Sequence, residues 1–326
     1  MTSAESILLV TPRSFGAGDP ALRPDLEMAV REVRYNRLGR PLRAEELRTQ
    51  IGDVDGLLAG LDEIDASVFA AAPRLRVVAR YGAGTSNVDL EAAAKHGVVV
   101  TNTPGANAEA VAELALGMMF ALARSLCHAD RVTHAGQWPS MRGLEIRGRT
   151  VGILGLGHIG QIVALSASSL GCNVLAYDPY TDERVAATCQ ARLGSLEEVV
   201  TRAHFLTLHL PLTPETRRIV NRALLERLPK GAYLINTARG ELVVEKDVLW
   251  ALDAGQLRGA ALDTLEREPP AADHLFRRRE DVILTPHIGA HTEEAAMAMG
   301  RHATHDLLAV LSGQSPRFAV TSSQGG

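Results

Sequence analysis

Three side chains of different chemistry follow short apolar segments in the second half of the chain. Arg239, Glu268 and His287 each come within a few residues of a run that is typical of a buried strand. Ligands bind at the carboxyl ends of the strands in an open α/β sheet. We therefore expect a guanidinium, a carboxylate and an imidazole to meet at one edge of a sheet.

These three groups suit the interconversion of a 2-oxo acid and a 2-hydroxy acid. A planar guanidinium holds a carboxylate through two parallel hydrogen bonds, and an imidazolium can protonate a carbonyl oxygen as hydride arrives. A carboxylate beside the imidazole favours its charged form and fixes its tautomer. Singly, each residue also has a structural reading, as a surface histidine, a loop acid or an arginine in a salt bridge. Their shared position after successive strands favours the catalytic interpretation.

A glycine-rich turn indicates the cofactor that such a reaction needs. Gly155, Gly157 and Gly160 form a G-x-G-x-x-G pattern between an apolar strand and a helical segment. The glycines permit a tight turn, close approach of the backbone to a pyrophosphate, and close packing of the helix on the strand. The free N–H groups of the helix N-terminus attract the anion. The pattern predicts a dinucleotide site, with a plain structural turn as the alternative.

The residues around this turn indicate which dinucleotide is bound. Asp178 lies 18 residues beyond Gly160, close to the spacing of about 20 at which an acidic residue binds the ribose hydroxyls. A carboxylate there repels a 2′-phosphate, so we expect NAD to be preferred over NADP. His158 and Ile159 begin the helix and are expected at the pyrophosphate. Because histidine is only partly charged near neutral pH, a solvent-facing role for His158 stays equally open.

Strand and helix patterns alternate along the chain, which predicts parallel α/β sheets. One series ends near residue 101, and a second begins at residue 150 and fills a doubly wound domain with six strands. Between them, 107–134 reads as one long helix with apolar surface that a partner must cover. A helix over 293–311, with no strand after it, is expected to pack on the first series. The predicted strands are 7–11, 33–36, 56–59, 76–80, 98–101, 150–154, 173–177, 205–209, 233–236, 259–263 and 282–285.

The composition is that of a globular protein. The chain has 326 residues, 46% hydrophobic and 22% charged, which excludes a disordered chain and suggests two domains. Its 34 basic and 38 acidic residues give a net charge of −4, so we expect no nucleic-acid partner. Three scattered cysteines favour neither a disulfide framework nor a metal site. Without a signal-peptide pattern or a membrane-spanning stretch, we expect a cytoplasmic protein with no membrane partner, and a loose tail over 321–326.

Several motifs, in order along most of the chain, carry a resemblance to a known family. Over residues 7–311 the sequence resembles the D-isomer-specific 2-hydroxyacid dehydrogenases, in particular their phosphoglycerate dehydrogenase-like branch. The resemblance implies an NAD-dependent oxidoreductase that acts on a small 2-hydroxy or 2-oxo acid. It also implies a Rossmann domain inserted into a flavodoxin-like substrate domain, each a doubly wound parallel sheet. The matching segments are 80–89 (RYGAGTSNVD), 101–113 (TNTPGANAEAVAE), 152–160, 209–211 (HLP), 236–240 (NTARG), 261–269 (ALDTLEREP) and 285–290 (TPHIGA).

The same resemblance implies roles for individual residues. Arg239 would bind the substrate carboxylate, Glu268 would be the partner of the histidine, and His287 would be the acid/base that contacts the substrate. The backbone N–H groups of Ala83 and Gly84 would face the substrate carboxylate. The further residues implied at the cofactor are Pro211 and Thr216 on the adenosine side, and Ala238, Asp263, Gly289 and Ala290 on the nicotinamide side.

The resemblance also implies how the chain is divided. Residues 1–101 and 291–326 would form the substrate domain and 102–290 the NAD domain, and 107–138 resembles the family's dimerisation arm, so we expect a homodimer. The chain departs from the family at Ser86, His158 and Leu265, where aspartate, arginine and an aromatic residue are common. The first departure is expected to affect only the start of the next helix. No C-terminal regulatory domain is expected.

Other functions, and the side chain of the substrate, stay open at this point. A glyoxylate or hydroxypyruvate reductase would use the same residues, and an NAD-sensing, corepressor-like binding protein would share the fold. The complete Arg239, Glu268 and His287 set argues against the sensor. A phosphorylated substrate needs further cations, for which Arg80 and Arg142 are the candidates, although both could equally be surface residues.

Overall fold

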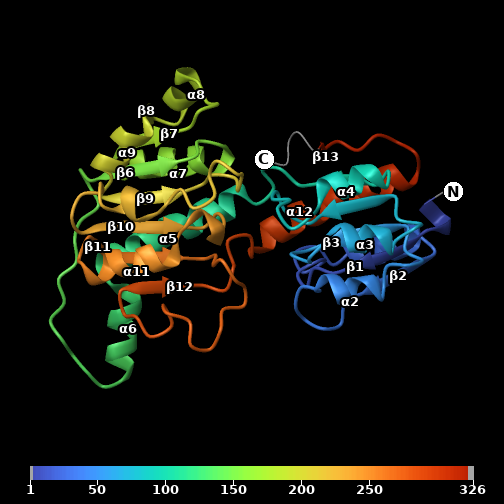
Figure 1. Ribbon diagram of the computed structural model, residues 1–326, viewed down its shortest axis with the longest axis horizontal. Helices are drawn as coiled ribbons and strands as arrows, with labels where there is room; N and C mark the ends of the chain where they lie inside the picture. Colours follow the sequence, from blue (N-terminus) through green and yellow to red (C-terminus); the bar gives the residue numbers. More distant parts are fainter. Residues whose placement is uncertain (1–2, 322–326) are drawn as a thin grey trace. The chain divides into compact units, whose positions relative to one another are not determined.

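The chain is described by a computed structural model over residues 3–321 (Figure 1). Contacts between residues group it into two units. Unit one comprises the chain up to Asn107 together with the part from Ala290 onward, and unit two is Ala108–Gly289. The boundaries between the two units fall at 107/108 and 289/290. The predicted boundaries were 101/102 and 290/291. Of the predicted loose tail, all but Thr321 lies outside the described residues.

Unit one contains a six-stranded sheet with the order β13-β5-β4-β3-β1-β2. Five strands are parallel, as predicted, and β1, β3 and β4 consist wholly of buried residues, as expected for strands covered on both faces. The sixth strand, β13, pairs antiparallel with β5, so the expectation of no strand after the last helix is wrong. Two residues are too few to show an alternation pattern. The strands are β1 Ile7–Val10, β2 Glu32–Tyr35, β3 Gly56–Ala59, β4 Val77–Arg80, β5 Val99–Thr101 and β13 Ala319–Val320.

Helices cover this sheet. α12 contacts β3, β4 and β5, which confirms that the C-terminal helix returns to the first series. It begins after Thr292, whose hydroxyl oxygen accepts a hydrogen bond from the Ala295 N–H at 3.1 Å, a common N-cap arrangement. On the other face, α2, α3 and α4 enclose an apolar core. The helices are η1 Ser3–Glu5, α1 Leu22–Ala29, α2 Ala44–Arg48, α3 Ala66–Ala70, α4 Leu90–Lys95 and α12 Glu293–Leu311.

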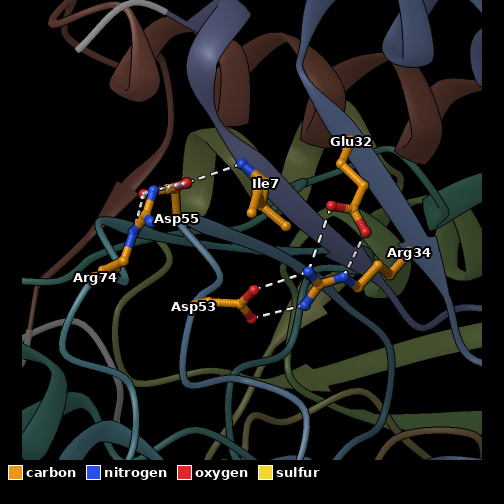
Figure 2. Close-up of polar contacts among 6 residues, drawn as sticks. All are labelled: Ile7, Glu32, Arg34, Asp53, Asp55 and Arg74. Carbon is orange, nitrogen blue, oxygen red and sulfur yellow. Dashed lines mark hydrogen bonds and ion pairs between the residues drawn. The ribbon is translucent and has the colours of Figure 1, made fainter.

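A buried carboxylate connects the amino-terminal ends of three strands of this sheet (Figure 2). Asp55, which is 1% exposed, accepts hydrogen bonds from the Ile7 N–H at 2.8 Å and from Arg74 at 2.9 Å. Close by, Arg34 donates to the exposed Asp53 at 2.7 Å. Asp55 therefore ties the first residue of β1 to the segments that precede β3 and β4.

Unit two contains a seven-stranded sheet with the order β12-β11-β10-β9-β6-β7-β8. All of its pairs are parallel. The six predicted strands are confirmed: 150–154 and 173–177 have the predicted bounds, and the other four differ by one or two residues at one or both ends. The two-residue β8 was not predicted. The strands are β6 Thr150–Leu154, β7 Asn173–Tyr177, β8 Arg192–Leu193, β9 Phe205–Leu208, β10 Ala232–Asn236, β11 Leu257–Leu262 and β12 Val282–Leu284.

Two apolar cores lie on opposite faces of this sheet, which makes it doubly wound. One core packs beneath α5, α7 and α8, and the other beneath α9, α10 and α11. Both units are thus α/β sheets of parallel strands, apart from β13, which agrees with the predicted fold class. The helices are α5 Ala108–Arg124, α6 Leu126–His134, α7 His158–Ser169, α8 Glu183–Thr188, α9 Leu196–Arg202, α10 Arg222–Leu225, η2 Gly240–Leu242 and α11 Glu245–Asp253.

The long helix predicted over 107–134 is in fact two helices. Ser125, between α5 and α6, has φ 50°, a left-handed conformation that ends a helix, and the two helix axes differ by 63°. α5 packs against α7, β10 and β11, so most of its apolar surface is covered by unit two itself and not by a partner. α6 extends away from the sheet (Figure 1). In the described part of the chain no single helix is long and apolar enough to cross a membrane, although α5 and α6 taken together pass that test by length and composition.

Candidate functional site

The glycine turn connects β6 to α7. Gly155 has φ +95°, and a Cβ atom there would lie 2.6 Å from the His209 carbonyl oxygen, so both conformation and space require glycine. A Cβ at Gly160 would lie 2.1 Å from the Gly155 carbonyl oxygen, so the helix approaches the turn closely. A Cβ at Gly157 would meet no described atom within 4 Å. The turn thus leaves open space beside Gly157 at the N-terminus of α7, as a bound pyrophosphate requires.

Asp178 follows β7 and is held beside this turn. One carboxylate oxygen accepts the Leu156 N–H at 2.8 Å, and the other accepts the N–H groups of Tyr180 at 2.8 Å and Thr181 at 3.1 Å. These backbone donors fix the orientation of a half-buried carboxylate next to the dinucleotide turn. Its contact with a ribose remains a prediction.

The two residues that begin α7 differ in their surroundings. His158 is exposed, whereas Ile159 is partly buried and packs against one of the cores of unit two. Neither the phosphate-contacting nor the solvent-facing role of His158 is decided by this placement. Ile159 anchors the first turn of the helix through its side chain, so only its backbone is suited to a phosphate.

The sequence analysis assigned no role to His209, which follows β9. Its Nε2 lies 3.0 Å from the Thr207 hydroxyl, and its buried Nδ1 has no hydrogen-bond partner among the described residues. Burial lowers the pKa of this histidine to about 3, so it is neutral at physiological pH. A buried ring nitrogen without a partner, next to the glycine turn, suits a site completed by a ligand. The HLP motif, 209–211, was the sequence feature that could have indicated a role for His209.

Pro211 and Thr216 border a loop after the same strand. The Thr216 hydroxyl donates to the Pro211 carbonyl at 2.7 Å and accepts the Thr213 N–H at 2.8 Å. The two residues predicted on the adenosine side are therefore joined directly, and Thr216 shapes the loop that presents Pro211.

Arg239 follows β10 in a turn fixed by a buried amide. Asn236, fully buried, accepts from the Ala238 N–H at 3.0 Å and donates to the Arg239 carbonyl at 2.8 Å. Burial lowers the pKa of the Arg239 guanidinium from its ordinary value, and the charges of Glu241 and Glu268 oppose that shift. Arginine still stays charged at neutral pH. Asn236 begins the NTARG motif, 236–240, and the sequence analysis predicted no role for it.

His287 and Glu268 form a direct pair. His287 Nδ1 lies 2.7 Å from one oxygen of Glu268, and the other oxygen accepts the Leu265 N–H at 3.0 Å. The side chains are 24% and 33% exposed, so both reach solvent. A carboxylate at Nδ1 fixes the tautomer in which that nitrogen carries the proton and leaves Nε2 to exchange protons with a ligand.

Asp263, at the end of β11, organises the turn that carries His287. Its carboxylate is 2% exposed and accepts from the Thr285 hydroxyl at 2.6 Å and from the N–H groups of Ile288 and Gly289 at 2.8 Å each. A Cβ at Gly289 would lie 3.1 Å from this carboxylate. Asp263 thus faces the 285–289 turn, and its predicted place beside a nicotinamide remains untested.

The structure places six of the predicted residues of unit two after the carboxyl ends of three neighbouring strands. β10, β11 and β12 are neighbours, so the residues that follow them lie side by side, and the direct contact between His287 and Glu268 confirms the expected convergence of those two. The residues at this edge are Ala238, Arg239, Asp263, Glu268, His287 and Gly289. Ala290, half-buried, begins the second part of unit one.

Ala83 and Gly84 belong to unit one, in the loop after β4. Arg80, which is 3% exposed, supports this loop by donating to the Tyr81 carbonyl at 2.7 Å and to Asn87 at 3.1 Å. Asn102 donates to the Ala83 carbonyl at 2.7 Å. Arg80 and Asn102 therefore bind carbonyl oxygens of this loop. The backbone N–H groups of the loop are the part suited to an anion.

One expectation about this loop is corrected. Arg80 is buried against protein carbonyls, so it is a supporting residue and not a cation available to a phosphate. Asn87, which matches the family pattern, accepts from Arg80 and donates to the Asp62 carbonyl, and the N-cap of α4 is Asp89. The expected effect of Ser86 on the start of this helix stays a prediction. Arg142, the other candidate cation, is exposed. Its carbonyl accepts from Arg258 at 3.1 Å at the amino-terminal end of β11, opposite to the end of the strand that precedes Asp263.

Comparison with protein families gives a match in unit two. Residues 116–289 match the model described as D-isomer specific 2-hydroxyacid dehydrogenase, NAD binding domain. The chain is 40% identical to the D-3-phosphoglycerate dehydrogenase of Methanocaldococcus jannaschii, over 91% of this chain and 57% of that protein. It is 38% identical to the glyoxylate reductase of Thermofilum pendens, over 86% of this chain and 85% of that one. The chain thus spans little more than half of the first of these relatives.

Solved structures share the fold over nearly the whole chain. The TT0316 protein from Thermus thermophilus is 36% identical and superposes with a TM-score of 0.87 over 97% of this chain and 100% of that one. The NAD⁺-bound 3-phosphoglycerate dehydrogenase of Entamoeba histolytica is 27% identical, with a TM-score of 0.80 over 98% and 99%. These likenesses confirm the predicted two-domain α/β architecture.

Proposed function

Because the chain belongs to the D-isomer-specific 2-hydroxyacid dehydrogenase family, we propose that it catalyses reversible hydride transfer between NAD(H) and a 2-hydroxy or 2-oxo acid. The observation that carries the proposal is the 2.7 Å contact between His287 Nδ1 and Glu268, at the sheet edge that Arg239 shares. In the catalytic interpretation, each of the three groups has one task.

The proposed mechanism assigns these tasks to atoms. The Arg239 guanidinium and the N–H groups of Ala83 and Gly84 bind the carboxylate of the substrate. The Nε2–H of protonated His287 donates to the carbonyl oxygen during reduction and takes the proton back during oxidation. Glu268 stabilises the imidazolium and keeps its orientation. NADH supplies the hydride when it is bound.

The chain's own residues suit NAD. Three features suit a dinucleotide site: the space beside Gly157, the N–H groups at the start of α7, and the His209 Nδ1, for which the described residues provide no hydrogen-bond partner. The family model and the NAD⁺-bound relative support the same cofactor. A preference over NADP rests on Asp178, whose fixed carboxylate would repel a 2′-phosphate.

For the substrate, the proposal is an acid of the D-3-phosphoglycerate dehydrogenase type. The relatives with that name support it, and the relative named glyoxylate reductase gives the alternative, a glyoxylate or hydroxypyruvate reductase. The burial of Arg80 and the placement of Arg142 favour the alternative, because they remove both predicted phosphate-binding cations from consideration.

A kinetic panel tests the proposal and separates the alternatives. NADH oxidation is measured with 3-phosphohydroxypyruvate, hydroxypyruvate, glyoxylate and pyruvate. The highest kcat/KM with the phosphorylated acid supports the first substrate, and the highest with glyoxylate or hydroxypyruvate supports the second. No turnover of any acid, together with tight NADH binding, supports the NAD-sensing binding protein.

We further propose that the protein forms a homodimer through the arm 107–138. α6 and the segment after it expose apolar side chains, with Leu126 52% and Trp138 90% exposed. An exposed tryptophan beside other apolar groups is typical of a protein interface. A second copy of this chain is the partner that the family resemblance suggests.

A further inference from the structure

The segment between β11 and β12 carries Glu268, yet it contains neither helix nor strand. A loop of this length orders a functional side chain only if other contacts hold it. Within the segment, the Glu268 carboxylate is bonded through the Leu265 N–H, which is a local contact. Contacts made by other residues of the segment must therefore fix the backbone position on either side of Glu268.

Glu245, in the first turn of α11, makes two contacts with this segment. One of its oxygens accepts the Glu266 N–H at 3.1 Å, and the other lies 3.0 Å from His274 Nε2. The Glu245 and His274 side chains are only 14% and 12% exposed. A single, nearly buried carboxylate thus binds the chain on both sides of Glu268.

His274 is itself fixed on the far side of the segment. Its ring packs edge-on against Phe276, with centroids 5.5 Å apart, and Phe276 is 1% exposed. The Phe276 N–H points to His274 Nδ1 at 3.4 Å. With Nδ1 as acceptor, the neutral ring carries its proton on Nε2 and donates it to Glu245.

We propose that Glu245 and His274 form a clamp that positions Glu268 against His287. The proposal rests on the catalytic roles given above to Glu268 and His287. Both clamp residues are positioning residues, since they act on the reaction only through the course of the 264–276 segment. The exposed pair of Arg218 and Glu266, at 3.3 Å, is no substitute, because exposed ion pairs contribute little.

Glu245→Ala is the first test. We expect kcat with the best 2-oxo acid to fall by about 10- to 100-fold, since a displacement of about 1 Å in a catalytic group has effects of that order. The Kd of NADH should stay within about twofold, because the glycine turn is untouched. Hydrogen exchange at the Leu265 and Glu266 amides should become faster. Glu226→Ala, which removes an exposed glutamate paired with Arg222, is the matched control and should change none of these.

A double-mutant cycle separates positioning from general damage. If the clamp acts through Glu268, Glu245→Ala has little further effect on kcat in a Glu268→Gln background. The same loss of kcat in both backgrounds would overturn the proposal. Glu245→Gln, which keeps one acceptor oxygen, should recover part of the activity.

Two further outcomes keep the clamp distinct from the proposed function. If the wild type turns over no 2-oxo acid, the proposed function fails, and amide exchange in the variants still decides whether the clamp exists. If Glu245→Ala does not fold, His274→Ala replaces it, with a smaller effect in the same direction. Unchanged amide exchange and unchanged kcat in a folded variant would refute the clamp.

Discussion

His287 is the residue on which the proposed chemistry depends. His287→Ala removes the only proton donor assigned to the carbonyl oxygen, so we expect kcat to fall by roughly 10²- to 10⁴-fold. NADH binding, measured by fluorescence titration, should be largely kept because the glycine turn lies on other strands. Near-wild-type turnover in this variant would rule out the acid/base role.

Asp178 is the residue proposed to select the cofactor. Asp178→Asn keeps an oxygen for the Leu156 N–H but removes the charge, so the ratio of kcat/KM for NADPH to that for NADH should rise by about tenfold or more. Asp182→Asn is the control, because Asp182 is the exposed N-cap of α8 and loses the same charge nearby. An unchanged ratio in Asp178→Asn, or an equal rise in the control, would contradict the assignment.

His209 makes the stability of the fold depend on pH. Its pKa is about 3 in the folded chain and about 6.5 when unfolded, so between these values the unfolded state binds more protons. The contribution of His209 to the free energy of unfolding is therefore constant above pH 6.5. It falls as the pH drops from 6.5 toward 3, by about 1.4 kcal/mol per pH unit. Urea unfolding at pH 7.5 and pH 5 measures this. His209→Gln, which does not titrate, should lose about 2 kcal/mol less over that interval, and an equal loss in both proteins would contradict the prediction.

At the level of single residues, the sequence predicted the reactive groups better than their supports. Arg239, Glu268 and His287 follow strands within a few residues, so sequence position alone indicates a shared edge. The supports act through the backbone across long sequence separations. Asp263 binds the N–H groups of a turn 25 residues away, and Arg80 is an arginine buried against carbonyls. No local pattern distinguishes such residues from surface polar groups.

At the level of elements, the hydrogen bonds of Asp55 stabilise the amino-terminal ends of β1, β3 and β4. Asp55→Ala leaves the Ile7 N–H without its acceptor, so we expect a loss of roughly 1–3 kcal/mol in the free energy of unfolding. Asp53→Ala removes an exposed partner of Arg34 and should cost about 0–1 kcal/mol. Urea denaturation, followed by a spectroscopic signal from unit one, measures the free energy of unfolding of each variant. An equal loss of stability in Asp55→Ala and Asp53→Ala would refute the special role of Asp55 (Figure 2).

Physical reasons explain why the sequence did not predict β8, β13 and the break between α5 and α6. β8 and β13 have two residues each, too few for periodicity. The helix 107–134 was predicted as continuous because its composition stays helical through the break. Ser125 adopts a conformation that costs energy in most residues, and no glycine or proline at this position signals the break. Long strands with apolar runs were predicted within one or two residues.

At the level of the whole molecule, the exposed arm predicts an assembly. If 107–138 forms the homodimer, Trp138→Ala should weaken it by about tenfold or more, since a central tryptophan often contributes over 2 kcal/mol. Analytical ultracentrifugation over a range of concentrations measures the change. Tyr180→Ala, which removes an aromatic side chain that is 96% exposed outside the arm, is the control. A wild-type monomer at all concentrations would contradict the proposal.

The overall architecture was predictable because the alternation of strands and helices restarts after a long helical stretch. The sequence also showed that a last helix had to pack somewhere, and α12 does cover the first sheet. The chemical identity of the substrate was not predictable, because it depends on which cations reach the site. Arg80 illustrates this, since only its burial shows that it supports a loop.

The split of unit one also sets an order of events during synthesis. α12 packs on β3, β4 and β5, yet it follows the whole of unit two in the chain. A ribosome therefore releases all of Ala108–Gly289 while the first sheet still lacks the helix that covers one of its faces. Domains generally fold as units as they emerge, so the inserted unit can complete its fold first. The N-terminal strands are synthesised first, yet one apolar face of their sheet stays uncovered until α12 emerges. Apolar surface that is exposed during synthesis is prone to aggregation, so this face is a place where a chaperone would act on the nascent chain.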